Sequence, residues 1–472
     1  MSEHCGYVVK ISELNPHSNA DRLQIATIFG ASVIVGLDVK IGDLGVYFPI
    51  DLQLSEEYCA QNNLVRKKDE NGNNVGGYLE PDKRNIRAMK LRGEKSEGLF
   101  MPLESLAYTG ETKFEVGEKI GVLNGHEICR KYIPKGNSGV ARAKDGNRTR
   151  KRSVPIAPLF AEHADTEQLV YHMDDIRPGD QIEITLKMHG TSGRTGYLPK
   201  FQGYKRTFWD KLFHREGTPI YDWGYVTGTR RVVLNDFEDG GYYGSNAFRA
   251  PHAKFFEGKL NKGETVYYEI VGFTTDGAPI MSSVANSKIS DKEFTKQYGK
   301  ETVFSYGCVP NPKSPEVKDW VYSEKVEDEV PVYEGTPEVQ SACYVYRMTL
   351  TTEEGYTVEY TPDFMRYRCE QMGAKCVLPF WKGYIPEDPY KRDMLTPGEL
   401  VKDIAEKYYD GPDPIGKTHV REGVVIRIVN RPKFCAYKHK NFNFKVLSGI
   451  AADLAAESGA TDMMDEDRLA EL

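Results

Sequence analysis

A lysine at the end of a predicted strand is the residue best placed for covalent chemistry in this chain. Lys187 follows the alternating run Gln-Ile-Glu-Ile-Thr-Leu (181–186), which predicts a strand, and precedes a turn that contains Gly190. A neutral lysine amine is a nucleophile, and a glycine lets the backbone pass close to a ligand. Taken alone, the pattern favours a surface lysine before a tight turn.

Charged residues also interrupt three other predicted strands. Glu269 lies within the apolar run 266–273, and Glu422 lies near the start of the run 421–427. Lys438 and Lys440 alternate in the run 437–446, so both side chains are expected on one face of that strand. Each residue alone fits a paired strand-edge charge or a solvated lysine face. Four such elements in this order point instead to one site.

The order of these elements resembles that of the covalent nucleotidyltransferases, the superfamily of DNA ligases, RNA ligases and mRNA capping enzymes. The resemblance covers about residues 165–448 and implies that Lys187 carries the nucleotide while Lys438 and Lys440 grip its α-phosphate. It also implies that Glu269 holds the ribose and that Glu422 serves the metal and the phosphates. Both carboxylates are candidate ligands of Mg²⁺ or Mn²⁺.

Two further motifs extend the resemblance. Gly-Thr-Arg-Arg (228–231) resembles the short arginine motif that follows the nucleophile, with Arg230 as the preferred residue. Tyr-Val-Tyr-Arg-Met (344–348) resembles the aromatic strand that stacks on the purine, with Tyr346 preferred over Tyr344. The other residues that the resemblance assigns to nucleotide binding are Gly190, His189 and Arg194.

One position departs from the superfamily, which usually has Asp before the motif glycine where this chain has His189. A histidine keeps a hydrogen-bonding group there but loses a fixed negative charge. The strings Lys-Met-His-Gly-Thr-Ser (187–192), Gly-Thr-Arg-Arg-Val-Val (228–233) and Lys-His-Lys-Asn-Phe-Asn-Phe-Lys-Val-Leu (438–447) look most like the Deinococcus-type RNA ligases. Those enzymes carry an additional N-terminal OB-like domain.

The physical requirements of adenylyl transfer fit the same residues. An α-phosphate is negatively charged and would repel a nucleophile, so Lys438 and Lys440 would supply fixed positive charge against it. Mg²⁺ would help to neutralise the leaving pyrophosphate of ATP. The reaction then depends on positioning and electrostatics, which suits a site built from strand ends.

The N-terminal region predicts a small β-barrel of the OB type. Short strands are predicted at the start of residues 8–23, at 33–35 and at 45–50, with a turn at Asn15-Pro16, and residues 84–101 close the unit. Residues 16–23 and 92–99 resemble the tRNA-binding domains of some aminoacyl-tRNA synthetases, over about residues 5–125. Its predicted nucleic-acid-binding face consists of Arg84, Arg87, Lys90, Arg92 and Lys95. The alternative is an inert barrel whose charges are solvated.

A basic arm follows this barrel. Residues 130–152 contain nine Lys or Arg and a single acid, Asp145, with three glycines between them. Such an arm beside two nucleic-acid domains is expected to follow phosphates, although a bland linker has the same composition. The arm residues assigned to nucleic-acid binding are Arg148, Arg150, Lys151 and Arg152.

Composition favours a reduced, cytoplasmic protein. The 472 residues suffice for two or three domains, and no apolar run reaches membrane-spanning length. The N-terminus lacks a signal-peptide core, and the eight cysteines form no CxxC pair or metal-ligand spacing. The net charge of −7 argues against unspecific binding of polyanions by the whole chain, although an acidic tail contributes much of it.

These observations predict an α+β protein with four segments. They are an OB-like nucleic-acid-binding domain (1–128), a basic linker (129–164), an adenylyltransferase domain of antiparallel sheets with flanking helices (165–448) and an acidic tail (449–472). We expect a monomeric, ATP-dependent RNA ligase that joins 3′-hydroxyl and 5′-phosphate ends, in a nicked duplex, a tRNA or a single strand, with no membrane partner. The alternatives are a DNA ligase, a guanylyl-transferring capping enzyme, or an RNA-binding scaffold whose nucleotidyltransferase domain is inactive.

Overall fold

The chain forms two compact units. The computed structural model describes residues 4–132 and 154–458, apart from 69, 72–73, 214, 235–236, 238–244, 282, 311–323, 328–329, 334–339 and 387–394. The N-terminal unit comprises Met1–Asn137, Asn286–Gln297 and Phe442–Thr461, and the central unit comprises Ser138–Ala285, Tyr298–Asn441 and Asp462–Leu472. The arm residues Arg148, Arg150, Lys151 and Arg152 lie outside the described residues.

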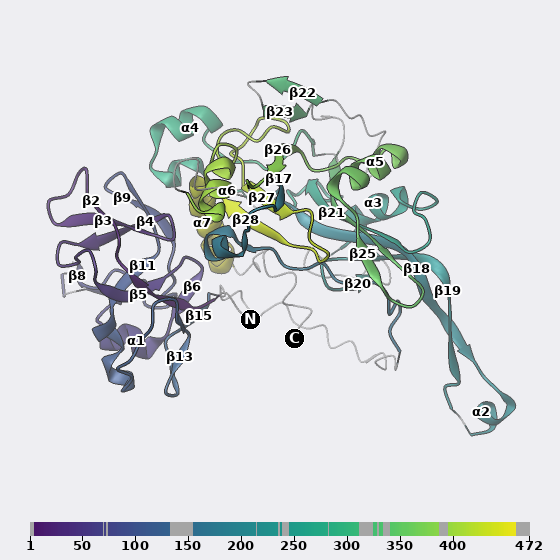
Figure 1. The fold of residues 1–472 in the computed structure, drawn as a ribbon, viewed down its shortest axis with the longest axis horizontal. Coiled ribbons are helices and arrows are strands. Elements are labelled where there is room, and N and C mark those ends of the chain that lie inside the picture. The colour runs from purple at the N-terminus through teal and green to yellow at the C-terminus, as the bar shows by residue number, and fades with distance from the viewer. Residues whose placement is uncertain are drawn as a thin grey trace. The chain divides into compact units, whose positions relative to one another are not determined.

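The N-terminal unit is built from short antiparallel strands, as the sequence predicts (Figure 1). Its strands are β1 (Gly6–Lys10), β2 (Leu14–Pro16), β3 (Leu23–Ile28), β4 (Ala31–Gly36), β5 (Leu44–Phe48), β6 (Leu52–Leu54), β7 (Lys67–Lys68), β8 (Asn74–Gly76), β9 (Ala88–Leu91), β10 (Glu94–Glu97), β11 (Leu99–Pro102), β12 (Lys119–Ile120), β13 (Val122–Leu123), β14 (His126–Glu127) and β15 (Cys129–Lys131). Four of them form a sheet in the order β11-β5-β1-β12, and three form the sheet β2-β3-β4. Asn15 and Pro16, predicted as a turn, instead end the short strand β2.

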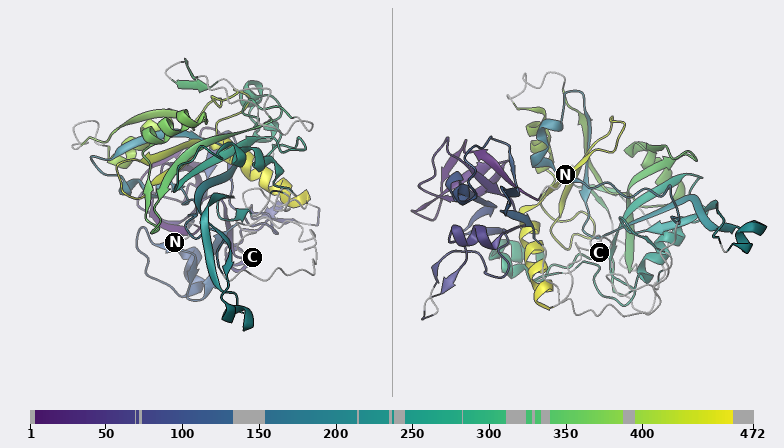
Figure 2. Two further views of the ribbon diagram at one scale, coloured as in Figure 1. Left: turned by 90° about the vertical axis from the view of Figure 1, so that its right-hand side faces the viewer. Right: turned by 90° about the horizontal axis from the view of Figure 1, so that it is seen from below.

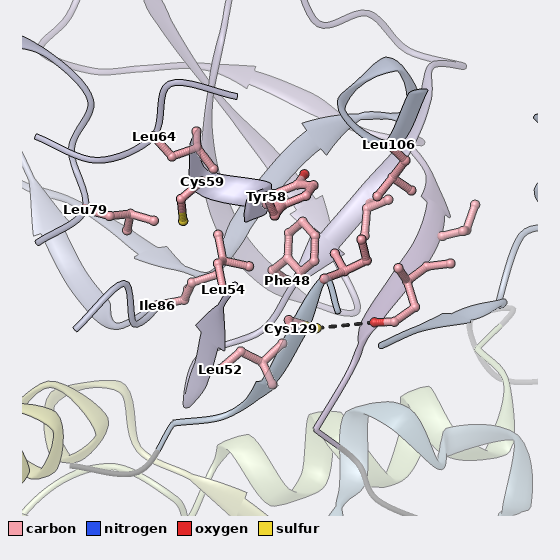
Figure 3. Packing of buried hydrophobic residues seen from close by; sticks show 14 residues of the cluster. Phe48, Leu52, Leu54, Tyr58, Cys59, Leu64, Leu79, Ile86, Leu106 and Cys129 are labelled. Atoms are coloured by element: carbon pink, nitrogen blue, oxygen red, sulfur yellow. Dashed lines mark hydrogen bonds between the residues drawn. The ribbon is translucent and has the colours of Figure 1, made fainter. Parts of the chain in front are cut away.

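An apolar core holds this unit together (Figure 3). Phe48 from β5 and Leu52 and Leu54 from β6 are fully buried, and Tyr58 packs edge-on against Phe48 at 5.3 Å between ring centroids. Tyr58 lies on helix α1 (Glu56–Gln61), which begins at Ser55 because the Ser55 hydroxyl accepts the Tyr58 N–H at 3.0 Å.

Two segments remote in sequence complete the N-terminal unit. They contain the helices α4 (Lys292–Tyr298) and α7 (Phe442–Ser458). Lys90 pairs with Asp291 at 2.6 Å and Lys445 pairs with Glu97 at 2.5 Å. The boundaries therefore differ from the predicted ones, because the central part of the sequence supplies residues to the first unit.

The central unit contains two sheets, and nearly all of their strand pairs are antiparallel. One sheet has the order β16-β28-β27-β17-β26, with β16 (Glu167–Gln168), β28 (Ala436–Lys440), β27 (Gly423–Ile428), β17 (Gln181–Lys187) and β26 (Pro379–Tyr384). The other has the order β20-β19-β18-β21-β24-β25, with β20 (Val233–Leu234), β19 (Thr218–Gly228), β18 (Thr191–Lys205), β21 (Glu264–Gly272), β24 (Ser341–Thr351) and β25 (Thr357–Glu359). A separate pair joins β22 (Glu324–Glu327) to β23 (Val330–Tyr333).

Helices of the central unit are short. They are α2 (Phe208–Leu212), α3 (Ala250–Phe255), α5 (Pro362–Met372) and α6 (Pro397–Glu406). The prediction of a helix that begins after Thr396 is confirmed, since Thr396 and Glu399 form a capping box and Pro397 follows at the first helical position. None of the helices within the described ranges combines the length and hydropathy needed to cross a membrane.

The predicted strand over 437–446 is only half correct. Strand β28 ends at Lys440 and helix α7 begins at Phe442. Beyond Lys440 the apolar spacing changes, because Phe442, Val446 and Ile450 recur every four residues, which is a helical spacing. Both lysines nevertheless lie within the strand.

Candidate functional site

One pocket of about 260 Å³ in the central unit gathers most of the predicted site residues. Its walls come from both sheets of that unit, and its volume is near the lower end of the range for small-molecule sites. The predicted residues that line it are Lys187, His189, Gly190, Arg230, Glu269, Tyr346, Glu422, Lys438 and Lys440. Arg194 is not among its lining residues.

Strand register brings Lys187 and Lys440 to the same carboxylate. Lys187 pairs across the sheet with Gly423, and Gly423 pairs with Lys440 on the next strand. Glu422 directly precedes Gly423, so its side chain meets both lysines. Its Oε1 lies 2.9 Å from Lys187 Nζ and 3.2 Å from Lys440 Nζ.

Glu422 is ionised in this arrangement. Its side chain is only 2% exposed, and burial by itself would raise its pKa. The ammonium groups of Lys187 and Lys440 outweigh burial and lower the pKa of Glu422 to about 2. Its Oε2 has no hydrogen-bond partner among the described residues, so it can still accept a hydrogen bond.

The turn after Lys187 crosses from one sheet to the other. Strand β17 ends at Lys187, and β18 begins at Thr191 in the second sheet. At Gly190 a Cβ would lie 2.3 Å from the Ile270 carbonyl oxygen, so only glycine fits. Gly190 was predicted to let the backbone approach a ligand. The close packing of the turn against strand β21 already requires a glycine at this position.

His189 occupies this turn as a neutral ring. Burial lowers the pKa of His189 to about 3, and its Nδ1 lies 3.7 Å from Glu422 Oε2. The ring packs edge-on against Phe304 at 4.6 Å. Its backbone N–H donates to the hydroxyl of Tyr306 at 2.7 Å, a contact that anchors the turn to a buried side chain. Tyr306 was not predicted to belong to the site, because nothing in its local sequence connects it to residue 189.

Glu269 lies on the wall formed by the second sheet. It pairs in register with Ser192, whose hydroxyl donates to Glu269 Oε2 at 3.2 Å. Burial raises the pKa of Glu269 to about 7, even though the positive charge of Lys187 opposes that shift. This carboxyl therefore titrates near neutral pH, whereas Glu422 does not.

An aromatic wall closes one side of the pocket. Tyr346 lines it, whereas the alternative Tyr344 is buried and is not among the lining residues. Its neighbours His163 and Phe434 were not predicted, and the His163 ring lies 4.9 Å from Tyr346 and 5.5 Å from Phe434. His163 falls in the segment that was predicted to be linker.

Arg427 was also missed, although an arginine inside the apolar strand 423–428 is a detectable signal. It is 8% exposed, lines the pocket and lies over the Phe434 ring at 5.1 Å. Its Nη1 has no hydrogen-bond partner in the described part of the chain. A buried donor of this kind suits a ligand acceptor.

The two predicted arginines have different environments. Arg230 lines the pocket, and its Nη2 pairs with Asp165 at 2.5 Å. Arg194 is buried and donates to the backbone carbonyls of Phe160 at 3.0 Å, Thr229 at 2.9 Å and Arg231 at 3.0 Å. It therefore fixes the turn that presents Arg230 and is not among the residues that line the pocket.

The predicted basic face of the N-terminal unit is partly used for internal contacts. Lys90 is paired with Asp291, and Lys95 lies over the Phe442 ring at 5.1 Å. Arg84 donates to the backbone carbonyls of Leu54 at 3.3 Å and Pro81 at 2.8 Å. Arg92 lies in the exposed turn between β9 and β10, and Arg87 is half-buried.

Comparisons with known proteins agree with this architecture. A family model described as an OB-fold domain matches residues 6–103, so the N-terminal unit contains an OB fold. No curated protein is significantly similar in sequence to this chain.

Solved structures of the Naegleria gruberi RNA ligase share the overall fold. A lysine-to-methionine variant with AMP and Mn is 15% identical with a TM-score of 0.52, over 94% of this chain and 98% of that chain. A glutamate-to-alanine variant with ATP and Mn is 14% identical with a TM-score of 0.52, over 94% and 98%. The same ligase with PPi is 16% identical with a TM-score of 0.51, over 93% and 97%. At such identities the likeness shows an α+β fold with an N-terminal OB domain and antiparallel sheets.

Tyr306→Phe tests the anchoring of the turn. Loss of the hydroxyl leaves the His189 N–H without its acceptor, which costs about 1–3 kcal/mol when buried. We expect the rate of any covalent reaction at Lys187 to fall roughly ten-fold at saturating ligand, with little change in ligand affinity. Tyr58→Phe is the matched control, since it removes a buried hydroxyl that donates to Ser105 at 2.8 Å in the other unit. A normal rate in Tyr306→Phe would rule out an anchoring role.

Glu269→Gln tests whether the Glu269 carboxyl titrates near neutral pH. Because the folded pKa of about 7 exceeds the usual value of 4.5, the folded state retains a proton that the unfolded state releases between these pH values. Wild-type stability should therefore lose roughly 3 kcal/mol from pH 5 to pH 8 through this group, a loss that the variant avoids. Urea unfolding at both pH values measures the difference.

Glu422→Gln is the control for that pH dependence. The pKa of Glu422 is lowered to about 2, so its contribution is lost only as pH falls from 4.5 towards 2. The stability difference between Glu422→Gln and wild type should thus change less from pH 5 to pH 8 than the difference between Glu269→Gln and wild type, because it reflects only the effect of the lost charge on the pKa of Glu269. Parallel pH profiles for Glu269→Gln and wild type would contradict the titration of Glu269 near neutral pH.

Proposed function

We propose that this chain is an ATP-dependent RNA ligase of the Deinococcus type that forms a covalent lysyl-AMP at Lys187. The observation that carries the proposal is the pairing of Lys187 and Lys440 with one buried carboxylate, Glu422, in a pocket with an aromatic wall. The likeness to the Naegleria gruberi RNA ligase, solved with ATP, AMP or PPi, supports the same activity. The OB fold supports a nucleic-acid substrate.

In the proposed first step, the Lys187 Nζ attacks the α-phosphorus of ATP. A nitrogen–phosphorus bond forms while the bond from phosphorus to the pyrophosphate oxygen breaks, and pyrophosphate leaves. The amine must lose a proton to water before it attacks. Glu422 Oε1 at 2.9 Å would hold the amine in position and would not act as its base, because the pKa of Glu422 is lowered to about 2. Lys438 and Lys440 line the same pocket and would stabilise the negative charge that develops on the phosphate.

The remaining pocket residues would orient the nucleotide. Tyr346 lines the pocket and would pack against the adenine, and Glu269 would accept hydrogen bonds from the ribose once it is ionised. The Nη1 of Arg427 provides an additional donor. The AMP would then pass to a 5′-phosphate end of RNA, and a 3′-hydroxyl would displace it in the sealing step.

A divalent cation fits this pocket only together with the nucleotide. No cluster of three or more His, Cys, Asp or Glu side chains suited to a metal occurs within the described ranges. Mg²⁺ is often held by one or two carboxylates and substrate phosphates, and Glu422 and Glu269 would supply the carboxylates here. When bound, Mg²⁺ or Mn²⁺ would neutralise charge on the leaving pyrophosphate.

Covalent labelling tests Lys187. The protein incubated with α-labelled ATP should retain the label on a denaturing gel, and Lys187→Ala should lose it entirely. Labelled GTP distinguishes a capping-type enzyme, which would accept GTP instead, and a scaffold would take up neither. Label that persists in Lys187→Ala would refute the assignment of the nucleophile.

Lys440→Ala tests the electrostatic role of the second lysine. Removing one preorganised cation should slow lysyl-AMP formation by roughly a hundred-fold or more. Lys445→Ala is a suitable control, because it removes a lysine five residues further along the chain that belongs to the N-terminal unit and pairs with Glu97. A near-normal rate in Lys440→Ala would support the alternative that this lysine is only a structural partner of Glu422.

A further inference from the structure

A long two-stranded ribbon extends from the sheet that carries Glu269 (Figures 1 and 2). Strands β18 and β19 pair from Arg194 with Gly228 to Lys205 with Thr218. Only residues 191–196 of β18 also pair with β21, so the outer part of β18 has β19 as its partner. Helix α2 (Phe208–Leu212) forms the end of this ribbon.

The end of the ribbon, which we call the tip (residues 205–213, 215 and 216), exposes large apolar side chains. Phe208 is 73% exposed, Trp209 62%, Leu212 54% and Phe213 59%. The Trp209 and Phe213 rings are nearly parallel, 6.0 Å apart with 15° between their planes. Exposed aromatic clusters on soluble proteins mark interaction sites, because water solvates them poorly.

This tip is held in a defined conformation. The Thr207 hydroxyl accepts the Asp210 N–H at 3.2 Å, and the Asp210 carboxylate accepts the Thr207 N–H at 2.9 Å, which together form a capping box. The aromatic rings are therefore presented by an ordered turn.

Basic residues lie in the same short segment as the exposed rings. Lys205, Arg206, Lys211 and Arg215 are all exposed, and the Arg215 guanidinium lies 5.7 Å from the Phe213 ring centroid. Two acids lie among these cations: Asp210 is used in the capping box, and Glu216 accepts from the Tyr204 hydroxyl at 3.3 Å. The whole chain has a net charge of −7, so this cationic cluster is a local feature.

We propose that the tip binds the substrate nucleic acid away from the reacting ends. Unpaired bases would stack on Trp209 and Phe213, while the four cations would contact phosphates. The proposal rests on the proposed function for the identity of the substrate as RNA. Planar rings beside guanidinium and ammonium groups match nucleobases and phosphates better than they match an aliphatic protein surface.

The ribbon also sets the distance of this contact from the pocket. Ser192 lines the pocket, and Lys205 lies thirteen residues further along the same strand. At about 3.3 Å per residue, the strand spans at most roughly 43 Å. Stacked nucleotides of one strand rise about 3.4 Å each, so the tip would reach unpaired nucleotides at most about a dozen positions from the ends being joined.

The double variant Trp209→Ala/Phe213→Ala tests this contact in the full chain. Its Kd for a labelled 5′-phosphorylated single-stranded RNA of about 24 nucleotides should rise about ten-fold or more, because base stacking on aromatic rings is lost. Lys211→Ala/Arg215→Ala should reduce the salt dependence of the same Kd. Tyr356→Ala is the matched control, since Tyr356 is 73% exposed elsewhere in the central unit.

Two further measurements separate this proposal from the proposed function. Lysyl-AMP formation should be unchanged in the tip variant, which also shows that the variant is folded. The joining of single-stranded RNA ends on strands of about 20 nucleotides should have a higher KM in the variant, while strands of about six nucleotides should show no difference, because they cannot reach the tip. The wild-type protein could form no lysyl-AMP while the tip variant still binds RNA more weakly than wild type. That result would refute the proposed ligase activity and support RNA binding by the tip.

An unchanged Kd for RNA in Trp209→Ala/Phe213→Ala would overturn the proposal. So would binding of the wild-type protein to phosphatidylserine vesicles that the double variant loses while its RNA affinity stays the same. That second result would assign the tip to a membrane surface, which basic aromatic segments can also bind.

Discussion

The buried carboxylate of Glu422 is the interaction on which the central unit depends. A buried ion is costly unless oppositely charged partners and hydrogen bonds compensate for lost solvation, and here Lys187 and Lys440 do so. The same contacts keep both cations inside a pocket where they would otherwise repel each other. Because the three residues lie on adjacent strands, a shift of one residue in the register of β27 would disperse them.

The pocket exists because one short turn joins two sheets. Lys187 ends a strand of the first sheet and Thr191 begins a strand of the second, so the chain itself connects the cationic wall to the wall with Glu269 and Tyr346. Gly190 permits the close approach of the turn to β21, and Tyr306 holds its backbone. Two walls of different chemistry suit a ligand with a charged part and an aromatic part.

Basic residues serve different purposes in the two units. In the N-terminal unit, three predicted surface cations contact a carboxylate, a ring and a carbonyl: Lys90, Lys95 and Arg84. These side chains therefore contribute to the stability of the fold. In the central unit, the exposed cations of the tip lie in the same short segment as exposed aromatic rings. Charge counts along a sequence do not separate these uses, since burial and partners decide how much of a charge remains available to a ligand.

The sequence alone determined the short-strand barrel, the strands that carry Lys187, Glu269 and Lys438, and the helix after Thr396, because alternation and capping residues act locally. It also identified nine of the residues that line the pocket. Tertiary structure decided the rest. Arg194 could not be separated from Arg230 by spacing, since only the fold surrounds Arg194 with carbonyls. His163, Phe434 and Tyr306 reach the site through contacts between distant segments, and no local pattern encodes such contacts.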